Sequence, residues 1–74
     1  MNRQTKTATI QSLLRAAAEL AADIAGELSE ASGAADQGET LQAIGTILGA
    51  PDVIAQLDAL VSAAMALNRA KEAK

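Results

Sequence analysis

Carboxylates, hydroxyls and a few lysines are the side chains in this sequence that could carry acid–base or nucleophilic chemistry. The 74 residues contain no His, no Cys and no Tyr. Ser12 and Ser29 have no base at a spacing that would activate them, and no glycine-rich loop that cradles phosphate is present. The soft metal ligands are missing, and the carboxylates do not cluster as an oxygen-ligated metal site requires. The sequence therefore predicts a protein that is not an enzyme and holds no metal and no cofactor.

Three carboxylates recur at four-residue steps, and these are Glu19, Asp23 and Glu27. Like charges at this spacing repel by about 0.2–0.5 kcal/mol per pair on a helix. Because this repulsion destabilises the helix slightly, the row of carboxylates is a candidate surface for binding a basic groove on another protein. The alternative is a solvated helix face that keeps an alanine-rich chain in solution.

Hydrophobic periodicity predicts three helices, over residues 9–31, 40–48 and 51–70, preceded by a flexible basic arm at residues 1–8. The first helix has an apolar stripe at three- and four-residue steps, formed by Ile10, Leu13, Leu14, Ala17, Leu20, Ala21, Ile24 and Leu28. No stretch alternates as a strand does. The predicted fold is all-α: one compact three-helix domain over residues 1–74, with two long helices and one short helix.

The expected breaks between these helices lie at glycines and at the single proline. Gly33 is a plausible stop for the first helix, and Asp36 with Glu39 has the spacing of a capping box for the second. Gly49 ends the second helix, and Pro51 suits the first turn of the third.

The segment 40–57 resembles, in its first half, the helix-turn-helix of DNA-binding regulators. Ile44, Gly45, Leu48 and Gly49 match that pattern. The would-be recognition helix departs from it, because it carries Asp52, Gln56 and Asp58 and no basic residue before Arg69. A chain of net charge −3 also lacks the phosphate-neutralising term of DNA binding. The sequence disfavours a nucleic acid as partner.

Composition points to a core that one chain cannot complete. Aromatic residues are absent and nineteen residues are alanine, so little surface is buried per side chain. The third helix is apolar over a wider arc than one neighbour covers, and small residues on the first helix allow close approach. We therefore expect homo-oligomerisation, favouring a dimer, through the candidate interface residues Ile54, Leu57, Val61, Ala64, Met65, Asn68, Ala18, Ala22 and Gly26.

The predicted function is that of a small helical protein–protein interaction module, such as an adaptor, a chaperone or a modulator of bacterial or phage type. The alternative is an oligomer that binds a polar or anionic small ligand between subunits, and DNA binding ranks below both. The N-terminus has no apolar signal segment and no long apolar run is evident. The expected location is the cytoplasm, with no membrane partner.

Overall fold

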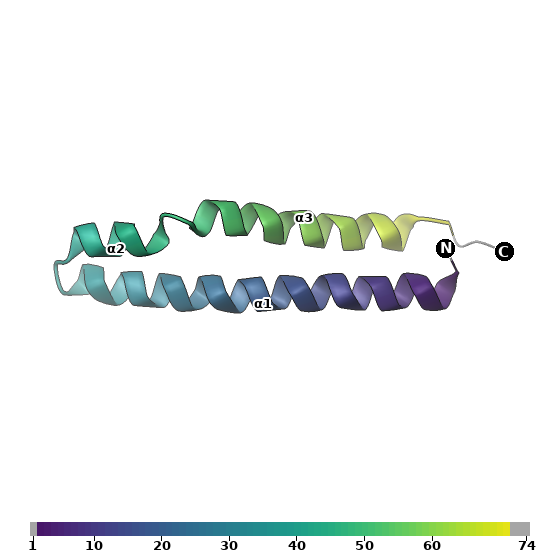
Figure 1. The fold of residues 1–74 in the computed structure, drawn as a ribbon, viewed down its shortest axis with the longest axis horizontal. Helices are drawn as coiled ribbons and strands as arrows, with labels where there is room; N and C mark the ends of the chain where they lie inside the picture. Colours follow the sequence, from purple (N-terminus) through teal and green to yellow (C-terminus); the bar gives the residue numbers. More distant parts are fainter. Residues whose placement is uncertain (1, 72–74) are drawn as a thin grey trace.

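The computed structural model describes residues 2–71 as an elongated helical hairpin (Figure 1). Helix α1, Arg3–Asp36, runs the full length of the molecule, and α2, Thr40–Ile47, followed by α3, Ala50–Arg69, returns along it. The molecule measures 60 × 14 × 12 Å. The all-α class is confirmed, and the described residues contain no strand. The compact three-helix bundle is not confirmed, because α2 and α3 are successive segments of one return rod rather than two separate neighbours of α1.

The N-terminal residues form the first turns of α1, whereas the sequence suggested a flexible arm before residue 9. Asn2 is the N-cap, and its side-chain oxygen accepts a hydrogen bond from the backbone N–H of Thr5 at 2.8 Å. This bond satisfies one of the N–H groups that have no partner within the helix. At the same end of the hairpin, Lys6 Nζ donates to the backbone oxygen of Ala70 at 2.9 Å, which ties α1 to the end of α3.

The tip of the hairpin is a Schellman turn centred on Gly38. Gly38 has φ of 81° and donates its N–H to Ala35, while the N–H of Glu39 donates to Ala34, both at 2.9 Å. This pattern closes a helix with glycine in the left-handed conformation. Gly33, the expected stop, lies inside α1. Continuing the helix past it places Ala34 against Ala43 and offsets the cost of a helical glycine, about 1 kcal/mol.

The expected capping box at this turn does not form. Asp36 is the last residue of α1 rather than the N-cap of α2. The N-cap position belongs to Glu39, whose side chain makes no capping hydrogen bond. Glu39 belongs both to the Schellman turn and to the start of α2, so no further residue lies between the turn and the helix.

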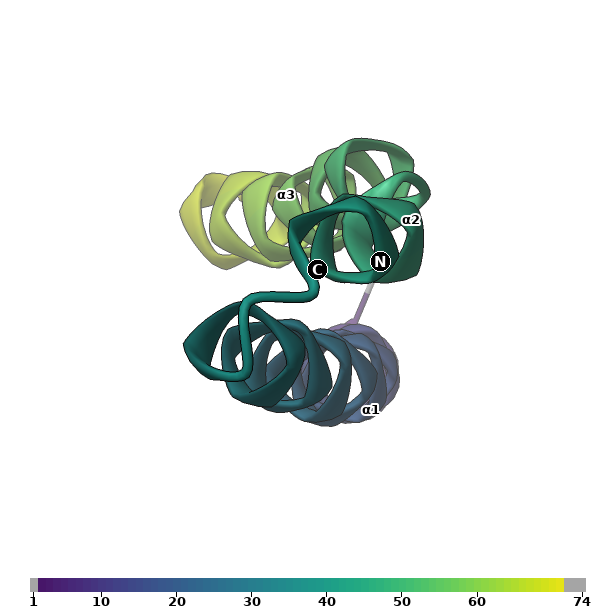
Figure 2. The ribbon, with the colours of Figure 1, turned by 90° about the vertical axis from the view of Figure 1, so that its left-hand side faces the viewer.

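The return rod is interrupted between α2 and α3, close to where the sequence predicts the break. Leu48 and Gly49 both keep a right-handed helical backbone. Pro51 has no N–H to donate back to the carbonyl of Ile47, so the ladder is broken there. The two segments therefore follow nearly the same line along α1, as the end-on view in Figure 2 shows.

A single seam joins α1 to the return rod. It repeats every seven residues, which is typical of helices that pack at a shallow angle and wind around each other. The buried side chains on it are all alanines, apart from Ile24. On α1 the seam consists of Ile10, Leu13, Ala17, Leu20, Ile24, Glu27, Ala31 and Ala34, and on the return rod of Ala43, Ala50, Val53, Leu57, Leu60, Ala64 and Leu67.

Three residues of the expected apolar stripe lie outside this seam. Leu14 and Leu28 are 47% and 48% exposed, and Ala21 between them is exposed as well. They follow seam residues by one position, so they flank the seam instead of filling it. The chain buries one row of α1 and leaves the neighbouring apolar row open.

Candidate functional site

The open apolar row of α1 continues across the seam onto α3. In an antiparallel helix pair, the position that flanks the seam on one helix lies beside the equivalent flanking position of the other. Lys6 is bonded to Ala70 at one end and Ala34 packs with Ala43 at the other, which sets Leu14 level with Val61. We call the resulting surface the apolar face, consisting of Leu14, Ala18, Ala21, Ala25 and Leu28 of α1 with Ile54, Val61 and Met65 of α3.

The apolar face is exposed in the single chain although it is built of core-type residues. Ile54 is 49% exposed and Met65 is 55% exposed, while Val61 is half-buried at the edge of the seam. Asp58 is the one charged residue that the same spacing places among them. On α1 the charged side chains of this stretch lie on the other flank and on the back of the helix, apart from Glu27 in the seam. A contiguous apolar surface of this kind marks a place where another surface packs.

Charge is divided sharply between the two halves of the hairpin. The half that holds the chain ends, residues 2–18 and 59–71, contains five basic residues and no Asp or Glu. The half that holds the tip, residues 19–58, contains eight acidic residues and no Lys or Arg. We call these the basic half and the acidic half. The start of α1 and the end of α3 lie at the same end of the molecule in Figure 1, so the basic half is a single region in space. The remaining two charged residues, Glu72 and Lys74, lie outside the described residues.

The α3 residues expected at an interface divide between two surfaces. Ala64 is 5% exposed and Leu57 is half-buried. Both lie in the seam against α1, so they serve the fold of the single chain and are not open to a partner. Ile54, Val61 and Met65 lie on the apolar face. Asn68 follows them at the same spacing and is exposed near the end of α3.

The small residues expected at an interface on α1 do not share one side of the helix. Each step of four residues advances about 40° around the axis, so the line from Ala18 through Ala22 to Gly26 turns away from the apolar face. Ala18 lies on that face and Gly26 lies on the back of α1. A Cβ atom added at Gly26 would meet nothing within 4 Å. Within the chain, therefore, no close approach requires this glycine.

The acidic row expected as a docking ridge follows the same turn around α1. Glu19 and Asp23 are exposed, whereas Glu27 is half-buried. Glu27 occupies a seam position between Ile24 and Ala31, and the register sets it level with Ala50 at the start of α3. The three carboxylates consequently do not form one flat ridge. They are better described as part of the acidic half, together with its other Asp and Glu residues.

The tip of the hairpin carries an apolar cluster that the sequence reading assigned to the core. Leu41, Ile44 and Leu48 are 90%, 56% and 74% exposed. The buried residue of α2 is Ala43, and the half-buried Ile47 packs against the cluster that Ala43 forms with Ala31 and Ala34. The three larger side chains, Leu41, Ile44 and Leu48, are turned outward. Ala43 packs with Ala31 and Ala34 of α1, so the seam is built of alanines on both helices here. The alanines at these positions were the feature of the sequence from which the contact could have been predicted.

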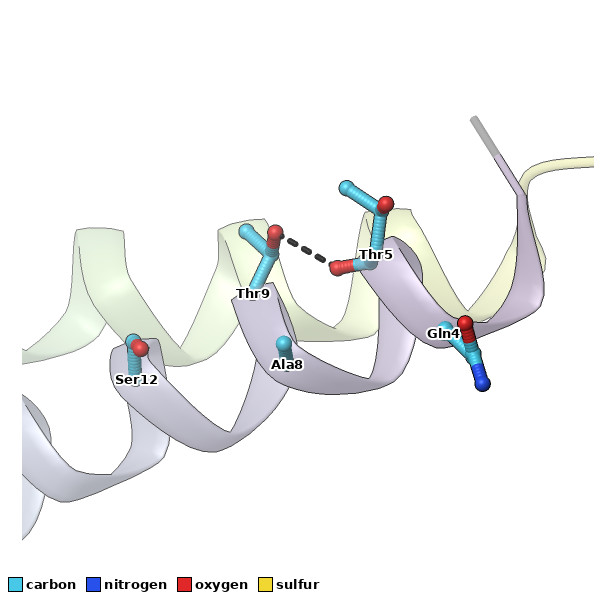
Figure 3. A pocket seen from close by; sticks show the side chains of 5 residues that line it. All are labelled: Gln4, Thr5, Ala8, Thr9 and Ser12. Carbon is cyan, nitrogen blue, oxygen red and sulfur yellow. Dashed lines mark hydrogen bonds between the residues drawn. The ribbon is translucent and has the colours of Figure 1, made fainter.

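The described residues show one notable surface depression, at the N-terminal end of α1 (Figure 3). Gln4, Thr5, Ala8, Thr9 and Ser12 line it, and all five belong to α1. The hydroxyl of Thr9 donates to the backbone oxygen of Thr5 at 2.8 Å. The depression is shallow and open, and its lining comes from one helix. It lacks the convergence of several elements that is typical of small-ligand sites.

The segment that resembles a helix-turn-helix does not have that arrangement here. In a helix-turn-helix the two helices cross steeply, whereas α2 and α3 both lie along α1 (Figure 1). The same stretch, Thr40–Arg69, is long and apolar enough to span a membrane by length and composition, with a mean hydropathy of 1.4 in its best window. The prediction from the sequence was that no long apolar run is present, and this segment is more apolar than that prediction implied.

Comparison of the chain with protein-family models, with curated proteins and with solved structures finds no match. The functional argument therefore depends on the residues and geometry described above.

Proposed function

We propose that the chain is a small non-catalytic helical interaction module that works as a homo-oligomer, with the apolar face as its binding surface. The observation that carries the proposal is the contiguity of that face. Core-type residues of α1 and α3 lie side by side there, with Asp58 the one charge among them. Two helices bury one row each, and the second row of α1 needs a further helix to cover it.

The energetics of the single chain support this proposal. None of the described side chains is less than 2% exposed, and six of the seven buried residues are alanines. A two-helix unit of this size supplies little stabilisation from such a core. Association through a second apolar row adds the missing burial, in the way that helical hairpins pair into four-helix bundles.

Three other functions receive less support. The surface depression on α1 is lined by one helix and is open, so it supports a small-ligand site poorly. DNA binding lacks both the crossing helices and a basic recognition helix. A membrane-spanning role depends on the hydropathy of Thr40–Arg69 alone, and this segment contains Asp52 and Asp58 within it, each costly in a bilayer.

The proposal is tested by placing the same charge on and off the apolar face. Ala21 lies on the face and Ala59 lies on the far side of α3, and both are exposed. Sedimentation equilibrium of the wild type, Ala21→Glu and Ala59→Glu is measured from about 1 to 100 μM, a range chosen around the affinities of ordinary specific pairs. We expect the wild type and Ala59→Glu to form the same oligomer and Ala21→Glu to weaken association at least tenfold.

A wild-type chain that stays a folded monomer over the whole range would contradict the proposal. Equal association of all three proteins would show that the oligomer forms through another surface. Co-sedimentation with neutral phosphatidylcholine vesicles is measured in parallel, because complete binding to them would favour the membrane reading of Thr40–Arg69 instead.

A further inference from the structure

We propose that the apolar face binds a second copy of this chain with the two hairpins antiparallel, so that the basic half of each lies over the acidic half of the other. This inference depends on the proposed function, because it names the partner and the orientation at the same surface. Two sources of evidence support it: the surface area left exposed by one chain, and the division of charge along the hairpin.

The exposed area is what a second chain of this size would be expected to cover. The chain exposes 5331 Å², whereas a compact folded protein of 7.5 kDa exposes about 4,250 Å² by the size scaling of monomeric proteins. The excess of about 1,100 Å² follows from the elongated shape and is of the same order as the roughly 800 Å² that each partner buries in a standard interface. Two rods packed along their length remove this excess from both chains at once.

The charge division selects the orientation. Two hairpins can pair face to face about a twofold axis along the rods or about one across them. The first, parallel pairing puts the two basic halves together and the two acidic halves together, with like charges adjacent at both ends. The second, antiparallel pairing puts the basic half of each chain over the outer part of the other's acidic half, which contains Glu27, Glu30, Asp36 and Glu39. Near the axis, where they face acidic residues of the second copy, lie Glu19, Asp23, Asp52 and Asp58. Electrostatic complementarity therefore favours the antiparallel dimer.

The apolar side chains match in the antiparallel pairing as well. A rotation about an axis across the rods lays α1 on α1 of the second copy, in opposite directions. With the axis at Ala21, Leu14 of each chain lies level with Leu28 of the other, because Ala21 is midway between them. The alanines Ala18, Ala21 and Ala25 occupy the middle, where their size lets the two α1 helices approach closely.

The return rods pair by the same rotation. The intrachain register sets Ala21 level with the first turns of α3, so Ile54 lies close to the axis and meets its own copy. Met65 then falls over α2 of the second copy, at the level of Ile44. Both side chains are more than half exposed in the single chain, at 55% and 56%.

Asp58 is the one charged residue on the apolar face, and the antiparallel pairing brings it close to the second copy. It falls near the start of α3 of the second copy. That end has no side-chain cap, since Gly49 is its N-cap residue. A carboxylate there interacts favourably with the positive end of the helix dipole, but Asp52 already lies in that first turn and opposes a second negative charge.

Single cysteines distinguish this dimer from its alternatives, because the wild-type chain contains none. We use Ala21→Cys, Leu14→Cys, Leu28→Cys and Val61→Cys, oxidised under mild conditions and read as covalent dimer on non-reducing gels. Disulfides form when the two Cα atoms are within about 7 Å. In the antiparallel dimer Ala21→Cys cross-links to itself, and Leu14→Cys cross-links to Leu28→Cys when the two are mixed.

The matched control is each of Leu14→Cys and Leu28→Cys alone. In the antiparallel dimer, two copies of either cysteine are about 21 Å apart along the axis, at 1.5 Å per residue, and stay reduced. A parallel dimer instead cross-links a mixture of Leu14→Cys and Val61→Cys and leaves Ala21→Cys reduced. That outcome overturns the orientation while leaving the oligomer intact.

Sedimentation of the reduced variants distinguishes a failure of the antiparallel orientation from a failure of the proposed oligomeric function. Dimers that cross-link in the parallel pattern contradict this inference alone. Monomers at all concentrations contradict the proposed function together with it. For the antiparallel dimer we expect cross-links of Ala21→Cys and of the mixture of Leu14→Cys with Leu28→Cys. The yield of covalent dimer in each should be at least tenfold above that of the single-variant controls.

Discussion

Two neighbouring rows of α1 have the same seven-residue spacing but different environments. The seam row contains Leu13, Leu20 and Ile24 and is covered by the return rod. The outer row contains Leu14 and Leu28 with alanines between them and is about half exposed. The comparison shows that a helix can have two surfaces of core type, of which the chain itself covers only one. The fold leaves the outer row unexplained, and the proposed intermolecular contact would cover it.

Leu20→Asp is expected to have the largest effect, because it breaks the covered row. Leu20 is half-buried in the middle of the seam, so the change removes apolar burial and desolvates a new charge, at a cost of about 2–4 kcal/mol. Since small domains have little stability to spare, we expect circular dichroism to show loss of most of the helix at 25 °C. Ser29→Asp, at an exposed position of the same helix, serves as the control and should keep the helix. A helical, cooperatively melting Leu20→Asp would mean that the seam is misassigned.

Glu27→Leu sharpens the comparison by making the covered row continuous. Glu27 is the one charged residue in the seam and is half-buried. A leucine there buries part of an apolar side chain and should raise the free energy of unfolding by about 1 kcal/mol, measured by urea denaturation. Glu30→Leu at an exposed position should change it little. If Glu27→Leu destabilised the protein, the carboxylate would be contributing a favourable interaction beside the start of α3.

Gly26→Ala tests the back of α1, away from both rows, and its expected effect is comparable or smaller. Alanine is favoured over glycine in a helix by about 1 kcal/mol, and the added Cβ meets nothing within 4 Å. We expect a higher melting temperature with unchanged sedimentation, and the same for Gly33→Ala. Dissociation of the oligomer by Gly26→Ala would show that a second chain approaches α1 at this glycine, as the sequence first suggested.

The sequence was sufficient to predict the helical class and the break before α3, because proline and glycine act locally there. It was not sufficient to choose between the two rows of α1. Leu13 with Leu20 and Leu14 with Leu28 satisfy the same periodicity, and only the return rod shows which row is covered. The same ambiguity misplaced Leu41 and Ile44 of α2, where the seam uses Ala43.

The end of α1 shows a second reason for the differences. Gly33 and Gly38 are both acceptable helix stops by local rules, yet the chain continues to Gly38. Packing of Ala34 against Ala43 adds a tertiary contribution that no local rule contains. Among the candidate site residues, Met65, Val61 and Ile54 were found from the width of the apolar arc. Leu14 and Leu28 were not, since they were assigned to the core.

The division of charge has a consequence for how the molecule behaves in an ionic solution. At physiological ionic strength the screening length is about 8 Å, far shorter than the 60 Å rod. An approaching molecule therefore senses one end at a time, and the net charge of −3 describes neither end. A cation-exchange surface and an anion-exchange surface should both retain the monomeric chain, each by a different end. Antiparallel pairing would shorten retention on both surfaces by covering each end with the opposite one.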